Sequence, residues 1–213
     1  MKPWDKIKRF FRNFAVEGLM IYVTVTVFIV FAASFIFPNI GISEYICFNR
    51  AEILRGQVWR VASFLFVPQT DSPLFMLINL YFYYIIGTSL EGYWGSVKFT
   101  RYFFAGAALL IAGGFIVGYV DAYYLYLSMF ISYAILAPSE QFLFFGIIPI
   151  KAKYLAALDG VFMAFNFIFG SVSERVSIGA SIILILLFFG KNIISRIKAK
   201  KRFNDFKKNF DDR

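Results

Sequence analysis

Six apolar segments follow one another along the chain, and no other feature constrains its fold as strongly. They cover roughly residues 19–37, 74–90, 102–120, 123–137, 154–169 and 177–190. A helix needs about 20 apolar residues to cross a ~30 Å hydrocarbon core. The chain is 60% hydrophobic, whereas soluble domains are about 45–50% apolar. We therefore predict an all-α membrane protein with six transmembrane helices. The fourth and sixth segments are short, so protein should shield them or the bilayer should thin around them.

The 22 lysines and arginines are distributed unevenly around these segments. With six spans and both termini inside, the only basic residues outside are Arg50, Arg55, Arg60 and Arg175. This asymmetry is typical of membrane proteins, whose cytoplasmic loops collect positive charge. It predicts that the N- and C-termini are cytoplasmic.

Outside the membrane domain, expected over residues 18–190, the basic residues gather in a cytoplasmic segment, 1–17, and a cytoplasmic tail, 191–213. Aromatic residues at helical spacing accompany them, such as Phe11 and Phe14, and predict amphipathic helices on an anionic inner leaflet. The alternative is a pair of charge clusters that only set the topology. In either role the basic residues act at the lipid surface. The net charge of +9 therefore does not indicate a nucleic-acid partner, and we expect none. The long first apolar segment favours a retained helix over a cleaved signal peptide.

The segment between the first two apolar stretches contains ILRGQVWRVASFLFVP, which is too apolar for a solvated loop. We expect it to be partly embedded, with Trp59 at headgroup depth and Arg60 paired or bound to carbonyl groups.

The second apolar stretch, FMLINLYFYYIIGTSLEGYWGSVKF, carries polar residues and glycines at fixed intervals. Gly87, Glu91 and Gly95 stand 8, 12 and 16 residues after Asn79. Residues four apart lie on one face of a helix. We expect Asn79 to face the bundle interior and Gly87 and Gly95 to permit close backbone approach. Glu91 should accept hydrogen bonds from the following loop or the start of the third helix.

Together with GQVWR, this spacing resembles the rhomboid superfamily of intramembrane proteins. Rhomboids carry a Trp-Arg pair in the first outer loop and His-x3-Asn, Gly, Glu and Gly at these intervals in the second helix. The segment PSEQFLFFGIIPIKAKYL is also similar to the bacterial rhomboid link between helices four and five. The resemblance covers roughly residues 19–190. It implies a six-helix core with cytoplasmic termini, in a bacterial plasma membrane.

The resemblance also implies where a serine-protease dyad would stand, and this chain departs from it at each position. Phe75 occupies the site of the second-helix histidine, and Tyr123 that of the nucleophilic serine. Gly179 falls near the site of the base on helix six, and the chain contains no histidine. A serine hydroxyl is a weak nucleophile unless a neighbouring base takes its proton.

Two serines on the fourth segment, Ser128 and Ser132, are weak candidates for a substitute nucleophile. A base for them is not evident. The more economical interpretation is hydrogen bonding to the preceding helical turn or tight helix packing.

Asp159 and Asn166 lie seven residues apart on the fifth segment. A carboxylate inside a membrane is a functional candidate by default. We nevertheless expect Asp159 near the inner interface, paired with Lys151 or Lys153. One cysteine, Cys47, and no histidine make a metal site or a metal cofactor implausible.

Three functions remain open from the sequence. The first is a catalytically inactive rhomboid-fold protein that binds transmembrane segments of client membrane proteins. The second is a rhomboid-type serine endopeptidase with a non-standard site. The third, from a different class, is a small transporter that uses Asp159 and Asn166.

Overall fold

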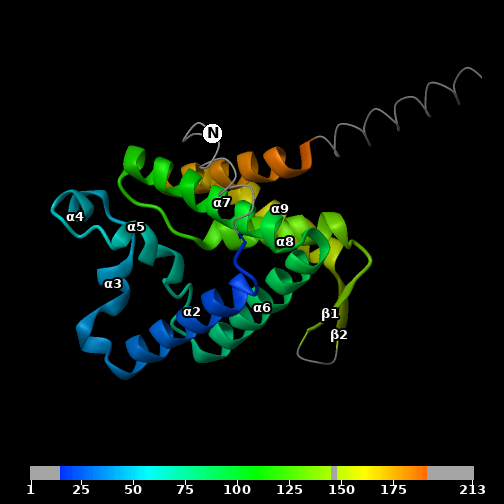
Figure 1. Cartoon of the computed structure of the whole chain (residues 1–213), viewed down its shortest axis with the longest axis horizontal. Coiled ribbons are helices and arrows are strands. Elements are labelled where there is room, and N and C mark those ends of the chain that lie inside the picture. Colours follow the sequence, from blue (N-terminus) through cyan, green and yellow to red (C-terminus); the bar gives the residue numbers. More distant parts are fainter. Residues whose placement is uncertain (1–14, 145–147, 191–213) are drawn as a thin grey trace, which may run out of the picture.

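The computed structural model describes residues 15–144 and 148–190. The amphipathic segments expected at both termini, and most of the basic residues in them, lie outside these described residues. Within them the chain is a helical bundle with one small β-hairpin (Figure 1).

In the described part of the chain, five helices are long and apolar enough to cross a membrane. They are α2 (Leu19–Ile36), α6 (Pro73–Trp94), α7 (Ser96–Val117), α9 (Ala152–Phe169) and a final helix over Val172–Gly190. The chain thus has the helices of an integral membrane protein.

The fourth apolar segment forms α8 (Tyr123–Leu136), whose 14 residues extend over only about 21 Å. Most of its residues are buried, among them Leu125, Met129 and Tyr133. The expectation that this short helix is shielded by protein is therefore confirmed.

The sixth segment was expected to be short, and this prediction is wrong, because the final helix begins at Val172 instead of near residue 177. A reciprocal capping box starts it. The Ser171 backbone N–H donates to Glu174 Oε2 over 2.6 Å, and the Glu174 N–H donates to Ser171 Oγ over 3.2 Å. These bonds satisfy two amides that the helix leaves free at its beginning.

Short helices fill the segment between α2 and α6. They are η1 (Pro38–Ile40), α3 (Ile42–Ile46), α4 (Arg50–Leu54), α5 (Arg60–Ser63) and η2 (Phe64–Phe66).

Arg60 holds these short helices together. Its side chain is 5% exposed, and Nη1 donates to the carbonyls of Glu44 and Cys47 over 2.5 and 3.0 Å. Nε donates to Gln57 Oε1 over 2.8 Å. Arg60 thus binds carbonyl groups, as the sequence predicts. Trp59 is 52% exposed, and its indole N–H donates to the Tyr45 carbonyl.

The regularly spaced residues of α6, which include Gly87, Glu91 and Gly95, have different roles in packing this helix against its neighbours. A Cβ added at Gly87 would lie 2.0 Å from Met20 Cγ, so this glycine lets α2 approach α6. Among the described residues, nothing lies within 4 Å of a Cβ at Gly95, so the expected close approach is wrong for this part of the chain. Gly95 has φ 76° and forms the turn between α6 and α7, a conformation that favours glycine.

Glu91 is an acceptor, but its donor differs from the one expected. Its Oε1 accepts from the Gly18 backbone N–H, just before α2, over 3.0 Å. The loop after α6 and the start of α7 were the predicted donors. Residues 18 and 91 are far apart in sequence, so local spacing cannot reveal this bond.

An antiparallel hairpin, β1 (Gln141–Phe144) and β2 (Ile148–Lys151), joins α8 to α9 and extends from the bundle (Figure 1). The all-α prediction missed it, because its continuous apolar run lacks the alternation that marks a strand. Phe142 on β1 is buried and lies 5.6 Å, ring to ring, from Phe82 on α6. The hairpin is thereby fixed to the helices.

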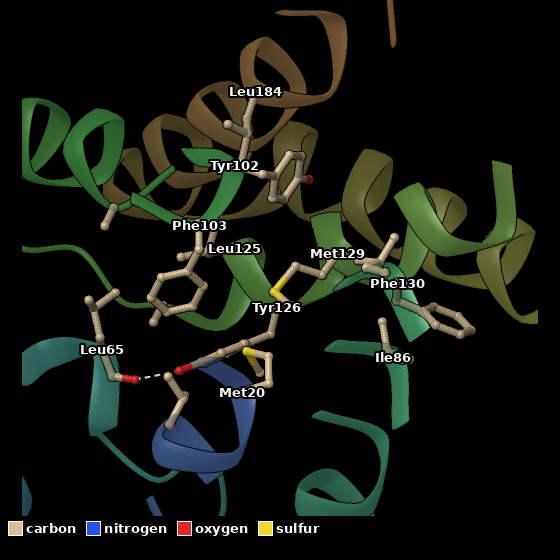
Figure 2. Packing of buried hydrophobic residues seen from close by; sticks show 14 of the residues in the cluster. Met20, Leu65, Ile86, Tyr102, Phe103, Leu125, Tyr126, Met129, Phe130 and Leu184 are labelled. Atoms are coloured by element: carbon tan, nitrogen blue, oxygen red, sulfur yellow. Dashed lines mark hydrogen bonds between the residues drawn. The ribbon is translucent and has the colours of Figure 1, made fainter. Parts of the chain in front are cut away.

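The core lies where α8 meets α2, α6 and α7 (Figure 2). α2 packs against α6, α6 against α7 and α8, and α8 against α9. The Tyr126 hydroxyl donates to the Leu65 carbonyl over 2.5 Å, which joins α8 to η2 (Figure 2). On α7, Gly106 leaves room for Leu125 and Leu184, since a Cβ there would meet both closer than 3 Å.

Candidate functional site

A cavity of about 230 Å³ lies between α6, α8 and α9. Its walls are Asn79, Phe82, Tyr83 and Ile86 from α6, Tyr123, Tyr126, Leu127 and Phe130 from α8, and Leu155 and Asp159 from α9. A space of this size accepts one or two side chains of a partner molecule. Most of the wall is aromatic or aliphatic, with a few polar groups among them, which is typical of a binding site.

Three polar residues that the sequence analysis singled out separately meet at this cavity. They are Asn79, Tyr123 and Asp159, from three different helices. Asn79 therefore faces the interior side of α6. Tyr123, at the position where the resemblance places a nucleophile, offers a phenol in its place.

The surroundings of Asp159 differ from those that the sequence predicts. Of the two lysines proposed as partners, Lys153 directs its Nζ over the Tyr154 ring, 4.9 Å from the centroid. Within the described residues, neither Lys151 nor Lys153 forms an ion pair with Asp159. The side chain instead lines the cavity, because its place on α9 turns it toward α8. The predicted pairing at the interface is therefore wrong.

Stacked aromatic rings form one wall of the cavity. Tyr83 and Tyr126 have ring centroids 4.1 Å apart and planes 22° from parallel. Phe82 and Phe130 meet nearby, with centroids 6.3 Å apart. Because Tyr126 is also held by its bond to Leu65, this wall is firmly positioned.

The opposite wall is α9, which is much less firmly packed. Its only fully buried residues are Ala152 and Met163, and apolar side chains such as Leu158 and Val161 are exposed along it. α6 and α9 both pack against α8, but within the described part of the chain they make few contacts with each other. The cavity therefore lies between two helices, α6 and α9, that are joined through α8 and through the hairpin, whose Phe142 packs on α6.

Ser128 and Ser132 lie away from the cavity lining and are fully buried. The Tyr102 hydroxyl on α7 donates to Ser128 Oγ over 2.9 Å and lies 3.0 Å from Ser132 Oγ. Ser128 Oγ also donates to the Leu125 carbonyl, three residues earlier, over 2.6 Å. The predicted bond to the preceding turn is confirmed for Ser128. Both hydroxyls join α8 to α7, and their partners include no base.

The remaining candidate positions also lie outside the cavity lining. Phe75, near the start of α6, is 60% exposed. Gly179, on the final helix, has nothing within 4 Å of where a Cβ would be. Asn166 is partly exposed and does not line the cavity. Asp159 and Asn166, proposed together as a transporter pair, are therefore not brought to one site. Among the described residues, no three His, Cys, Asp or Glu side chains are grouped to hold a metal ion.

Asp121, which the sequence analysis did not single out, positions the edge of the cavity. Its Oδ1 accepts from the Tyr123 backbone N–H over 2.9 Å, at the start of α8. Burial raises the pKa of Asp121, the nearby Glu174 raises it further, and the bond from Tyr123 lowers it. An Asp two residues before a helix is a recognisable turn and cap signal, so the sequence did contain this information. Tyr83 also had a signal, since it lies four residues after Asn79 on the same face.

We compared the chain with protein-family models and with curated proteins. No family model matches it, and no curated protein matches it. The cavity and the residues around it are therefore what indicates a function for this chain.

Proposed function

We propose that this chain is a catalytically inactive, rhomboid-like membrane protein whose cavity binds transmembrane segments of client proteins. The observation that carries the proposal is the cavity between α6, α8 and α9, with Asn79, Tyr123 and Asp159 at its walls and α9 loosely packed on one side. A client helix or its side chains would enter between α6 and α9, which make few contacts with each other in the described part of the chain.

The rhomboid-like assignment is supported by the motif spacing and by the packing of its residues. Gly87 admits α2, Glu91 binds the start of α2, and Arg60 holds the segment between the first two spans. In this proposal α8, which is the fourth apolar segment, also crosses the membrane and brings the number of spans to six. It is short because its neighbours shield it. Both termini are cytoplasmic, and the membrane is that of a bacterial cell.

Proteolysis would need an activated nucleophile at a site open to a substrate. Ser128 and Ser132 are buried and hydrogen-bonded to Tyr102, and the chain has no histidine. The residues at the cavity offer an amide, phenols and a carboxylate. These groups bind polar atoms well, and none is a serine with a neighbouring base. Binding is therefore the better supported function.

The test uses purified protein in liposomes with a panel of defined single-span proteins. Leu155→Trp fills the cavity, and Leu158→Trp is the matched control, because Leu158 is 65% exposed on the same helix. We expect cross-linking of clients to fall with Leu155→Trp and to persist with Leu158→Trp. Equal cross-linking by both variants would contradict a binding role for the cavity.

The same liposomes test the two alternatives. Cleavage of a panel member that is lost in Ser128→Ala or Ser132→Ala would overturn the inactive assignment. Transport is favoured by one observation, the carboxylate of Asp159 at the cavity. Proton or solute flux that disappears in Asp159→Asn would favour a transporter over a client-binding protein.

A further inference from the structure

Asp159 is the only acidic residue of the cavity lining in the described chain, and no Lys or Arg stands beside it there. It is the eighth residue of α9, which places it about 10 Å along the helix from Ala152. The cavity thus holds one carboxyl group well inside the span, with its negative form unmatched by a basic residue in the wall.

Charged groups inside a membrane are costly unless another group compensates for them. Among the described residues, no neighbouring group supplies the positive charge that would compensate Asp159. Tyr126 already directs its hydroxyl to the Leu65 carbonyl, and Lys153 lies over Tyr154. Asn79 and Tyr123 also line the wall, and the amide and the phenol each carry an oxygen that can accept a hydrogen bond. The set of acceptors matches an ammonium or guanidinium group.

We propose that the cavity selects transmembrane segments that carry a lysine or arginine near the middle of the membrane. Asp159 accepts hydrogen bonds from the cationic group, and Asn79 and Tyr123 provide additional oxygens. The aromatic wall of Tyr83 and Phe82 contacts the aliphatic stem of the basic side chain. This inference depends on the proposed function and defines which clients the same site accepts.

The experiment places one reporter thiol in the cavity wall, which is simple because the chain has a single cysteine. Cys47→Ser removes it, and Leu127→Cys places one reporter thiol in the cavity wall. The probes are polyleucine transmembrane peptides with one cysteine and a central Lys, Gln, Glu or Leu. Disulfide cross-linking in liposomes under mild oxidation measures occupancy of the cavity by each peptide.

We expect the Lys peptide to cross-link about tenfold more than the Leu peptide, a preference on the scale of a charge-assisted hydrogen bond. Asp159→Asn should abolish this preference while cross-linking of the Leu peptide continues. Asp159→Lys should transfer the preference to the Glu peptide. Asn166→Leu, on the same helix but outside the cavity, should retain the preference for Lys.

Two results would overturn the inference and they are distinguishable. Equal cross-linking of the Lys and Leu peptides, or a Lys preference that survives Asp159→Asn, would remove charge selection and leave client binding intact. Failure of every peptide to cross-link at Leu127→Cys would remove the proposed function together with the inference.

Discussion

The Glu91 carboxylate accepts a hydrogen bond from the backbone N–H of Gly18 over 3.0 Å, between residues 73 positions apart in sequence. Gly18 precedes α2 and has φ 64° without a side-chain cap of its own. A carboxylate from α6 thus satisfies an amide that the first helix leaves free. The bond fixes the start of α2 to the end of α6, beside the Gly87–Met20 contact.

We predict that Glu91→Ala lowers the free energy of unfolding by about 1–3 kcal/mol, because the Gly18 amide loses its partner in a partly buried place. Glu91→Gln keeps an acceptor oxygen and should lose less. Thermal unfolding in detergent measures both. Equal melting temperatures for Glu91→Ala and the wild type would show that water replaces the carboxylate without cost.

We also predict that Gly87→Ala destabilises the protein by about 1–3 kcal/mol, since the added methyl group overlaps Met20 and overpacking displaces α2. Gly92→Ala is the matched control on the same helix, because none of the described residues lies within 4 Å of its Cβ position. It should be neutral or slightly stabilising, as alanine favours a helix more than glycine. The same loss in both variants would point to a general effect of substituting α6.

Tyr102→Phe should destabilise the contact between α7 and α8 by about 0.5–2 kcal/mol. It removes the hydroxyl that binds Ser128 and lies beside Ser132. Ser132→Ala removes one of these contacts and should cost less. If the double variant loses as much as the sum of the single losses, the two groups act independently and the shared bond is not important.

The pH dependence of stability should carry a contribution from Asp121. Burial raises the pKa of its carboxyl group in the folded state, so the folded protein binds that proton more tightly than the unfolded chain does. The stabilisation that comes from this tighter proton binding is therefore fully present below the pKa of an Asp in the unfolded chain, about 3.9. It is lost as the pH rises through the higher folded value.

Asp121→Asn should remove this dependence, while its side-chain oxygen still accepts from the Tyr123 amide. We expect the variant to be more stable than the wild type at neutral pH and to show a flatter profile of melting temperature against pH. An unchanged profile would mean that solvent reaches the carboxylate in the folded protein. Asp71→Asn, a substitution of an exposed carboxylate outside the cavity, is the control.

Several features of the fold follow from local patterns in the sequence. Runs of apolar residues locate the long helices, because a helix in lipid must satisfy its own backbone. The predicted bounds miss by up to six residues, since α7 begins at Ser96 instead of near residue 102. The burial of Arg60 against carbonyls follows from its place in an apolar segment. The inward face of Asn79 follows from its spacing to Gly87 and Glu91. The capping box at Ser171 was also readable, and its omission made the sixth helix too short.

Only the tertiary structure decided which distant segments of the chain contact one another. It assigned Gly18 to Glu91, packed Phe142 of the hairpin against α6, and placed Asp159 of α9, Tyr123 of α8 and Asn79 of α6 on the walls of one cavity. Helical periodicity fixes which face a side chain occupies, since that depends on neighbours three and four residues away. It carries no information about which other helix lies against that face, and the cavity exists only because three helices meet there.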